Sequence, residues 1–208
     1  MNKRIKIFDL TEQYKSLSKK VNKDILKILK SGQYILGDNV NKLEEEFSNF
    51  IGSKYSVSCN SGTDALVLSL RALDIGHGDE VITTPFTYFA TAEAIALVGA
   101  KPIFADIDPK TFNINYNDIE KYINRRTKAI LPVHLFGQSA EIIKIKKLCK
   151  KYRISLIEDC AQSFGAKKNS KYTGTFGDFG CFSFFPTKNL GCAGDGGMIT
   201  TNSNFKMK

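Results

Sequence analysis

Lys188 is the residue whose surroundings most favour chemistry. It follows the apolar segment 182–186 and precedes the glycine-rich run Gly194–Gly197. Burying an ammonium is costly unless the amine is paired or loses its proton, and a neutral amine can form a Schiff base with a carbonyl compound. An ordinary lysine in a surface loop explains the stretch equally well. The sharper interpretation, a Schiff base with pyridoxal 5′-phosphate, also requires a carboxylate for the pyridine nitrogen, an anion-binding cup and a flat surface for the ring.

Ser61, Gly62 and Thr63 could form that cup. They stand between a predicted strand at 55–59 and a predicted helix that carries Leu66 to Leu73. A strand followed by small and hydroxyl residues at a helix start directs backbone N–H groups, and the positive end of the helix dipole, at an anion. The same residue types also suit an ordinary helix N-cap, which is the favoured explanation if the segment is taken alone.

Asp159 and one aromatic residue could supply the other two parts. Asp159 follows a predicted buried strand at 154–157, and ligands of open α/β sheets bind at the carboxyl ends of strands. A carboxylate that caps the next element is the alternative. Phe86, Tyr88 and Phe89 follow a predicted strand at 80–84. Such aromatic residues usually lie in the core, but one of them could stack on a flat cofactor.

The elements that must position these residues alternate along the chain. A helix with apolar residues at three- and four-residue steps is predicted at 12–31, and a second is predicted after Asp38-Asn39. Further helices are predicted at 90–98, 116–124 and 139–151. Further strands are predicted at 102–105, 129–133 and 197–201. This alternation predicts an α/β fold with a mostly parallel sheet and helices on both faces. No Walker A pattern is present, and the spacing Gly174, Gly177, Gly180 is too loose for a dinucleotide fingerprint.

Composition narrows the possible functions. The 208 residues carry a net charge of +9, but the lysines are scattered, and the cluster 144–153 has the spacing of a solvated helix face. No basic-aromatic recognition pattern indicates nucleic-acid binding. The five cysteines form no CxxC pair, so we expect neither a metal site nor a disulfide framework, and a reducing cytoplasm is the default compartment. A charged start at 1–5 predicts no secretory signal, and no stretch approaches the ~20 apolar residues of a membrane helix.

Taken together and in order, these pieces resemble the DegT/DnrJ-type sugar aminotransferases, which are pyridoxal phosphate enzymes of the aspartate-aminotransferase-like fold (fold type I). The resemblance spans roughly residues 5 to 202. It rests on the segments Ser31–Gly37, Asn60–Leu66, Gly78–Ile82, Thr127–His134, Glu158–Ser163, Phe182–Asn189 and Gly194–Gly197.

The resemblance implies a role for each site residue. Lys188 would form the Schiff base and act as the general base, and Asp159 would keep the pyridine nitrogen protonated. Gln162 would bind the ring's phenolic oxygen, and Tyr88 would stack on the ring. The phosphate would be held by Ser61, Gly62, Thr63 and Ser183. His134 would lie near the site, whereas Asn189 and Asp195 would shape the loop.

The resemblance also implies the reaction and the assembly. We expect amination of a nucleotide-linked keto-sugar by L-glutamate in amino-sugar or polysaccharide biosynthesis, by a homodimer. The segments Gln33-Tyr34 and Pro85–Tyr88 favour a 3-keto substrate. Residues 1–208 would be an incomplete large domain, with N-terminal helices in 1–50 and the sheet core in 55–201, and would lack a smaller C-terminal domain. A sugar dehydratase of the same fold is an alternative that Lys188 argues against, and a truncated, non-catalytic pyridoxal phosphate-binding or regulatory protein is another.

Overall fold

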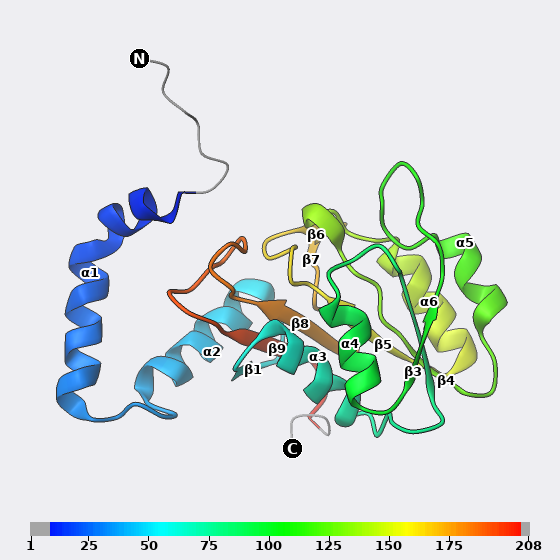
Figure 1. The fold of residues 1–208 in the computed structure, drawn as a ribbon, viewed down its shortest axis with the longest axis horizontal. Coiled ribbons are helices and arrows are strands. Elements are labelled where there is room, and N and C mark those ends of the chain that lie inside the picture. The colour runs from blue at the N-terminus through cyan, green and yellow to red at the C-terminus, as the bar shows by residue number, and fades with distance from the viewer. Residues whose placement is uncertain (1–8, 205–208) are drawn as a thin grey trace, which may run out of the picture. The chain divides into compact units, whose positions relative to one another are not determined.

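The computed structural model describes residues 9–204 (Figure 1). The chain divides into two compact units, 1–43 and 44–208, and the boundary falls inside helix α2 (Asp38–Ile51). The division into N-terminal helices and a sheet core, at 1–50 and 55–201, stays a prediction. The expectation about the charged start at 1–5 lies outside the described residues. Among the residues described, no helix combines the length and apolar character that crossing a membrane requires.

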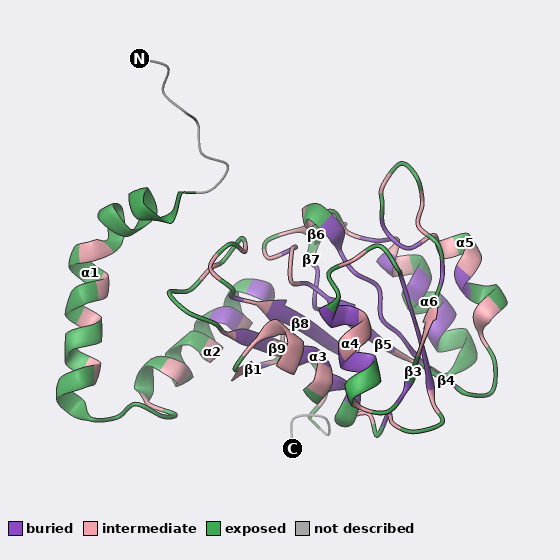
Figure 2. Ribbon diagram, viewed as in Figure 1, coloured by how far each residue is buried: buried purple, intermediate pink, exposed green. Residues whose placement is uncertain are grey.

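The first unit contains helix α1 (Leu10–Ser31), which confirms the helix expected at 12–31. Asp9 caps its start by accepting the N–H of Thr11, and Gly32 ends it in the left-handed conformation with its own N–H bonded to the carbonyl of Ile28. None of the residues of α1 is buried (Figure 2).

The second unit is built around a seven-stranded sheet. Its order is β1 (Tyr55–Cys59), β9 (Gly197–Thr201), β8 (Phe179–Ser183), β5 (Ser155–Asp159), β4 (Thr127–Ile130), β2 (Glu80–Thr83) and β3 (Lys101–Phe104). All neighbouring pairs from β8 to β3 are parallel, whereas β9 runs antiparallel to both β1 and β8. The expected α/β fold with a mostly parallel sheet is therefore confirmed.

Helices cover both faces of this sheet, as expected (Figure 1). Helices α3 (Gly62–Arg71) and α4 (Ala90–Leu97) pack on one face. The other face is covered by α5 (Tyr116–Ile119), α6 (Ile142–Tyr152) and the end of α2. The shorter elements are the 3₁₀ turns η1 (Glu120–Tyr122) and η2 (Leu135–Gly137) and the hairpin β6 (Lys167–Lys168) and β7 (Lys171–Tyr172).

Buried strand residues alternate between the two faces, because successive side chains of a strand point to opposite sides. In β5, Leu156 belongs to the core under α5 and α6, and Ile157 belongs to the core under α3 and α4. The next two residues, Glu158 and Asp159, continue this alternation as buried carboxylates. Asp159 therefore shares the α4 face, where Thr91 contacts it.

Several sequence-based boundaries were wrong. The strand expected at 154–157 extends through Asp159, so both carboxylates lie within it. The helix expected at 116–124 ends at Ile119 and tightens into η1, because Asn124 leaves the helical path to bond Thr127 and Glu80. The helix expected at 139–151 begins only at Ile142.

The aromatic residues that follow β2 do not lie in the core, where such residues are usually found. Phe86, Tyr88 and Phe89 are all exposed and do not belong to the core.

Candidate active site

A cavity of about 390 Å³ lies at the carboxyl ends of β5 and β8. All eight residues that the sequence nominates line it: Ser61, Gly62, Thr63, Tyr88, Asp159, Gln162, Ser183 and Lys188. They come from loops and element ends that are distant in sequence, which is how parallel sheets assemble ligand sites. The structure thus brings the whole predicted set together, while the role of each residue stays a prediction.

The phosphate cup (Ser61, Gly62 and Thr63) is the first turn of α3. The Ser61 hydroxyl accepts the N–H of Asp64 at 3.0 Å, so the N-cap favoured for the isolated segment is present. The cup also faces the cavity, so the two interpretations are compatible. Backbone N–H groups in a first helical turn have no intrahelical acceptor, and they suit an anion.

Ser183, at the end of β8, lies against this helix start. Gly62 allows the approach, because a Cβ atom at that position would lie 2.6 Å from the Cβ of Ser183. The Ser183 hydroxyl accepts the N–H of Phe185 at 3.3 Å and retains its own proton for donation. Hydroxyl and amide donors thus converge on one end of the cavity and fit a phosphate group.

Asp159 lies in the wall of the cavity and is only 4% exposed. One carboxylate oxygen accepts the N–H of Ala161 at 3.1 Å, and the other accepts the hydroxyl of Thr91 at 2.8 Å. Burial raises the pKa of Asp159, and these two hydrogen bonds and the charge of Lys188 oppose the rise. A buried carboxylate with a nearby cavity suits a protonated ring nitrogen.

Lys188 stands in the loop between β8 and β9. The base of this loop is closed by the N–H of Phe184 bonded to the carbonyl of Gly196, and Lys188 itself donates its N–H to Phe185 at 2.8 Å. Its ammonium lies 5.9 Å from the ring centroid of Tyr88. No carboxylate in residues 9–204 forms an ion pair with Lys188, so its amine is available to a ligand.

Tyr88 and Gln162 complete the lining. Tyr88 is 72% exposed, which leaves its ring open for stacking. The amide oxygen of Gln162 accepts the N–H of Phe136 at 2.9 Å, so its NH₂ group remains to donate to an oxygen of a ligand. Together with the cup and the carboxylate, this donor set fits pyridoxal phosphate.

Sequence reasoning missed part of the lining. Thr87, Thr91 and Val133 also face the cavity, and no local pattern marked them beyond the four-residue spacing of the two threonines. Asp195, expected only to shape the loop, lines the cavity as well. His134, expected near the site, is fully buried, and its backbone N–H donates to the carbonyl of Asp159.

His134, Glu158 and Cys160 place three potential metal ligands within 4.8 Å of one another. The carboxylate of Glu158, however, already accepts the N–H groups of Gly174, Phe176 and Gly177 at 2.7–2.9 Å, besides its contact with His134. A metal would have to displace these bonds. The group is therefore better explained as a structural network.

Known proteins similar to this chain agree with the geometry. A profile of the DegT/DnrJ/EryC1/StrS aminotransferase family matches residues 15–207. The UDP-2-acetamido-2-deoxy-3-oxo-D-glucuronate aminotransferase of Pseudomonas aeruginosa is 49% identical over 96% of the chain, which covers 56% of that protein. A pleiotropic regulatory protein of Geobacillus stearothermophilus is 47% identical over 96% of the chain and 54% of its own length. The chain spans about half the length of the curated relatives it matches.

Solved structures lead to the same family. An aminotransferase of Brucella abortus superposes with a TM-score of 0.94 at 38% identity, over 98% of this chain and 56% of the other. NtdA of Bacillus subtilis, solved with bound PMP, has a TM-score of 0.90 at 32% identity, over 100% of this chain and 48% of the other. The seven-stranded sheet matches the large domain of fold-type I aminotransferases. Three relatives, 46–49% identical, are named as aminotransferases of UDP- or dTDP-linked sugars, and the chain itself belongs to the DegT/DnrJ/EryC1/StrS aminotransferase family.

Proposed function

We propose that this chain carries the cofactor site of an aminotransferase that uses pyridoxal phosphate to aminate a nucleotide-linked keto-sugar, with L-glutamate as the amino donor. The observation that carries the proposal is the convergence of the eight nominated residues on one cavity, in a chain of this family. Amino-sugar or polysaccharide biosynthesis is the corresponding cellular role.

The residues of the chain divide the work. When bound, the cofactor supplies an electron sink for the carbon that loses its proton. The Nζ atom of Lys188 would hold the cofactor covalently and, once free, would act as the base that moves the substrate proton. The Asp159 carboxylate would hold a proton on the ring nitrogen by its charge. Tyr88 would stack on the ring, and the amide NH₂ of Gln162 would donate to its phenolic oxygen.

The phosphate cup and Ser183 orient the cofactor. Amide donors at the α3 start and the hydroxyls of Thr63 and Ser183 bind the phosphate without requiring a positively charged side chain. This fixes the cofactor relative to the Lys188 amine.

A 3-keto sugar nucleotide is the proposed substrate. Two relatives, 49% identical to the chain, are named as aminotransferases for a 3-oxo and a 3-dehydro UDP-sugar. A third relative, 46% identical, is named as a transaminase of a dTDP-3-amino sugar. These names support a substrate that has its carbonyl at C3 and is linked to a nucleoside diphosphate. They leave the choice of base open.

A regulatory, non-catalytic pyridoxal phosphate-binding protein is the second candidate, favoured by the likeness to the pleiotropic regulatory protein of Geobacillus stearothermophilus. A sugar dehydratase of the same fold is less well supported, because Lys188 is the residue that the dehydratases replace.

The assembly proposed for the enzyme is a homodimer in the cytoplasm, with a site completed by the partner subunit. Light scattering measures its mass, and an active monomer would contradict a shared site. The chain spans about half the length of its relatives. We therefore expect a protein of only these residues to bind pyridoxal phosphate weakly and to turn over no sugar.

Amination of a panel of 3-keto and 4-keto sugar nucleotides tests the function. The full-length gene product is incubated with pyridoxal phosphate, L-glutamate and each sugar, and the amino sugar is measured by mass spectrometry. Lys188→Ala should abolish the product, whereas Lys168→Ala, which removes a lysine paired with Glu141 on the surface, should not. Cofactor binding without amination of any sugar would favour the regulatory candidate.

A further inference from the structure

Thr91 contacts the Asp159 carboxylate from helix α4. Its hydroxyl oxygen lies 2.8 Å from Oδ2 of Asp159, and the Thr91 side chain is only 1% exposed. A second hydroxyl, that of Thr87, lies 2.9 Å from the Thr91 oxygen and faces the cavity. Three oxygen atoms thus form a short chain from the cavity wall to the buried carboxylate.

The direction of these hydrogen bonds follows from their donors. An ionised carboxylate can only accept, so Thr91 must give its single proton to Asp159. The Thr91 oxygen is then an acceptor, and Thr87 donates to it. If Asp159 becomes protonated, both hydroxyls can reverse. With a charged Asp159, the proton of Thr91 points to the carboxylate and that of Thr87 points to Thr91.

The two threonines flank Tyr88, the residue proposed to stack on the cofactor ring. Thr87 lies in the bend that precedes α4 and Thr91 lies in the first turn of α4, with Tyr88 between them. The hydroxyl chain therefore fixes the segment that carries the proposed ring-stacking residue to the carboxylate proposed for the ring nitrogen. One pair of side chains can set both the orientation of Asp159 and the position of this segment.

We propose that Thr91 is a positioning residue: its hydroxyl, held by that of Thr87, keeps the Asp159 carboxylate ionised and oriented into the cavity for the ring nitrogen. The inference rests on the proposed function for its purpose, because only a protonated ring nitrogen requires a charge there. It rests on the geometry alone for the effect of Thr91 on Asp159.

The other titratable groups around Asp159 do not replace this contact. Lys188 acts on Asp159 through its charge, and neither Lys188 nor the side chain of His134 bonds the carboxylate oxygens of Asp159 in the described structure. Burial raises the pKa of the thiols of Cys160 and Cys181 well above the ordinary value, so both remain uncharged at neutral pH. Glu158, its neighbour in β5, points to the opposite face of the sheet, where the Gly174–Gly177 segment binds it.

The test compares three variants of the full-length gene product. Thr91→Val keeps the shape of the side chain but removes the hydroxyl, Thr91→Ser keeps the hydroxyl, and Thr87→Val removes only the second donor. The first readout uses cofactor-free protein: infrared difference spectra of the carboxyl band over pH, with Asp159→Asn to identify the signal. Thermal unfolding of each variant confirms that it is folded.

We expect Thr91→Val to raise the affinity of Asp159 for its proton about tenfold, since a hydrogen bond to a charged group is lost. Thr87→Val should have a smaller effect in the same direction, and Thr91→Ser should titrate like the wild type. The second readout is the absorbance of bound pyridoxal phosphate over pH, in which Thr91→Val should lower the pH at which the ring nitrogen loses its proton.

The outcomes separate the two proposals. An unchanged titration of Asp159 in folded Thr91→Val overturns the positioning role, whether or not the wild type binds the cofactor. If Thr91→Val is unfolded, the titration of Asp159 is compared between Thr87→Val and the wild type instead. An unchanged titration in Thr87→Val then overturns the positioning role of the two hydroxyls. If the carboxyl titration shifts as expected but the wild type binds no pyridoxal phosphate, the contact is supported and the proposed function fails.

Discussion

Nε2 of His134 lies 3.0 Å from Oε2 of Glu158, and both side chains are completely buried. Nδ1 of the same ring accepts the N–H of Ala140 at 3.1 Å, so the ring proton stands on Nε2 and is donated to the carboxylate. The pair is therefore a hydrogen bond from a neutral imidazole to a carboxylate. The negative charge of Glu158 is held by this donor together with three backbone N–H groups.

Glu158→Gln should destabilise the fold strongly. The amide NH₂ would replace an acceptor oxygen, and one of the buried donors would face another donor. We expect a loss of about 3 kcal/mol in the free energy of unfolding, as for other broken buried charge networks. Urea denaturation measures it. Glu141→Gln is the control, because its exposed pairs with Lys144 and Lys168 should contribute about 1 kcal/mol or less. Equal losses for the two variants would contradict the network.

Gly62→Ala should weaken binding of pyridoxal phosphate. The new methyl group would meet the Cβ of Ser183 at 2.6 Å, so the start of α3 must move away from β8. The matched control is Gly194→Ala, in the loop that follows Lys188, where a Cβ meets nothing within 4 Å. Fluorescence titration with pyridoxal phosphate should show an affinity at least tenfold lower for Gly62→Ala only. Wild-type affinity in that variant would remove the cup from the phosphate site.

Borohydride reduction should attach a pyridoxyl group to Lys188. Its amine faces the cavity and forms no ion pair with a carboxylate in the described part of the chain, so it is the expected site of attachment. Peptide mapping by mass spectrometry identifies the labelled lysine. Lys188→Ala should give no label, and Lys171→Ala should label as the wild type. A label on any other lysine would show that the assignment is wrong.

Asp159→Asn should make the cofactor-free protein more stable at neutral pH. The same change should lower the activity of the cofactor-loaded enzyme by about a hundredfold or more. Burial raises the pKa of Asp159 in the folded state, so the folded protein binds a proton more tightly than the unfolded chain does. The free energy of unfolding therefore falls as the pH rises from the ordinary pKa of an aspartate through the raised pKa of Asp159. The folded protein is less stable when Asp159 is charged. The uncharged variant avoids this loss.

Thermal unfolding between pH 4 and pH 8 measures the effect. The difference between Asp159→Asn and the wild type should be smallest at the acid end and should grow with pH. Single-turnover reaction with glutamate measures the rate. A variant that is less stable at neutral pH would contradict the raised pKa, and an unchanged rate would remove Asp159 from the proposed chemistry.

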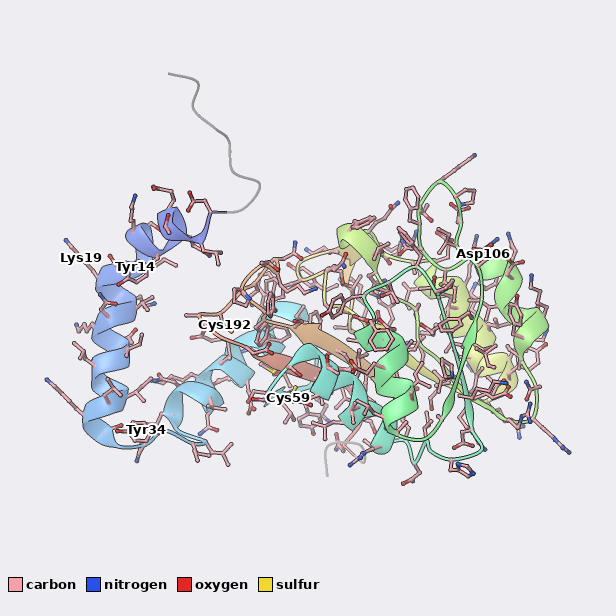
Figure 3. The ribbon with its side chains drawn as sticks, in the orientation of Figure 1. Tyr14, Lys19, Tyr34, Cys59, Asp106 and Cys192 are labelled. Carbon is pink, nitrogen blue, oxygen red and sulfur yellow. The ribbon has the colours of Figure 1, made fainter. Side chains whose placement is uncertain are left out.

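Alkylation by iodoacetamide should be selective for Cys192. This thiol is exposed on the loop that carries Lys188 (Figure 3). The thiols of Cys149, Cys160 and Cys181 are buried. Burial raises the pKa of Cys59 to about 11 and that of Cys149 to about 12, so few of their thiols are ionised at pH 8. Mass spectrometry of the folded protein should show one fast modification that is absent in Cys192→Ser. Rapid labelling of Cys149 would contradict its burial.

Much of the site could be predicted, because each part has a local signal. The Ser61–Thr63 cup is a strand-to-helix turn, and Asp159 and Lys188 each follow an apolar segment. Their convergence follows from the rule that parallel strands end at one edge of a sheet. Thr91 could not be predicted in this way, since its importance arises from a contact with Asp159, 68 residues later, that no local pattern encodes.

The three glycines Gly174, Gly177 and Gly180 show the same limit. Their spacing does not fit a dinucleotide fingerprint, and the structure gives another reason for them. A Cβ at Gly174 would collide with the ring of Phe182, and one at Gly177 would collide with the carbonyl of Leu156. The chain must pass this close so that the N–H groups of Gly174 and Gly177 reach Glu158. Such crowding depends on partners distant in sequence.

The antiparallel strand β9 has a consequence for how the protein is made. Strand β1 and the start of α3 leave the ribosome early, but in the sheet β1 is an edge strand whose hydrogen-bonding neighbour is β9, with Tyr55 opposite Thr201 and Cys59 opposite Gly197. Closing so long a loop is slow, and β1 cannot pair with β9 before β9 has been synthesised. The phosphate cup should therefore be among the last parts to gain protection in pulsed hydrogen exchange, and a nascent chain released before β9 emerges should be held by chaperones with its cofactor site unformed.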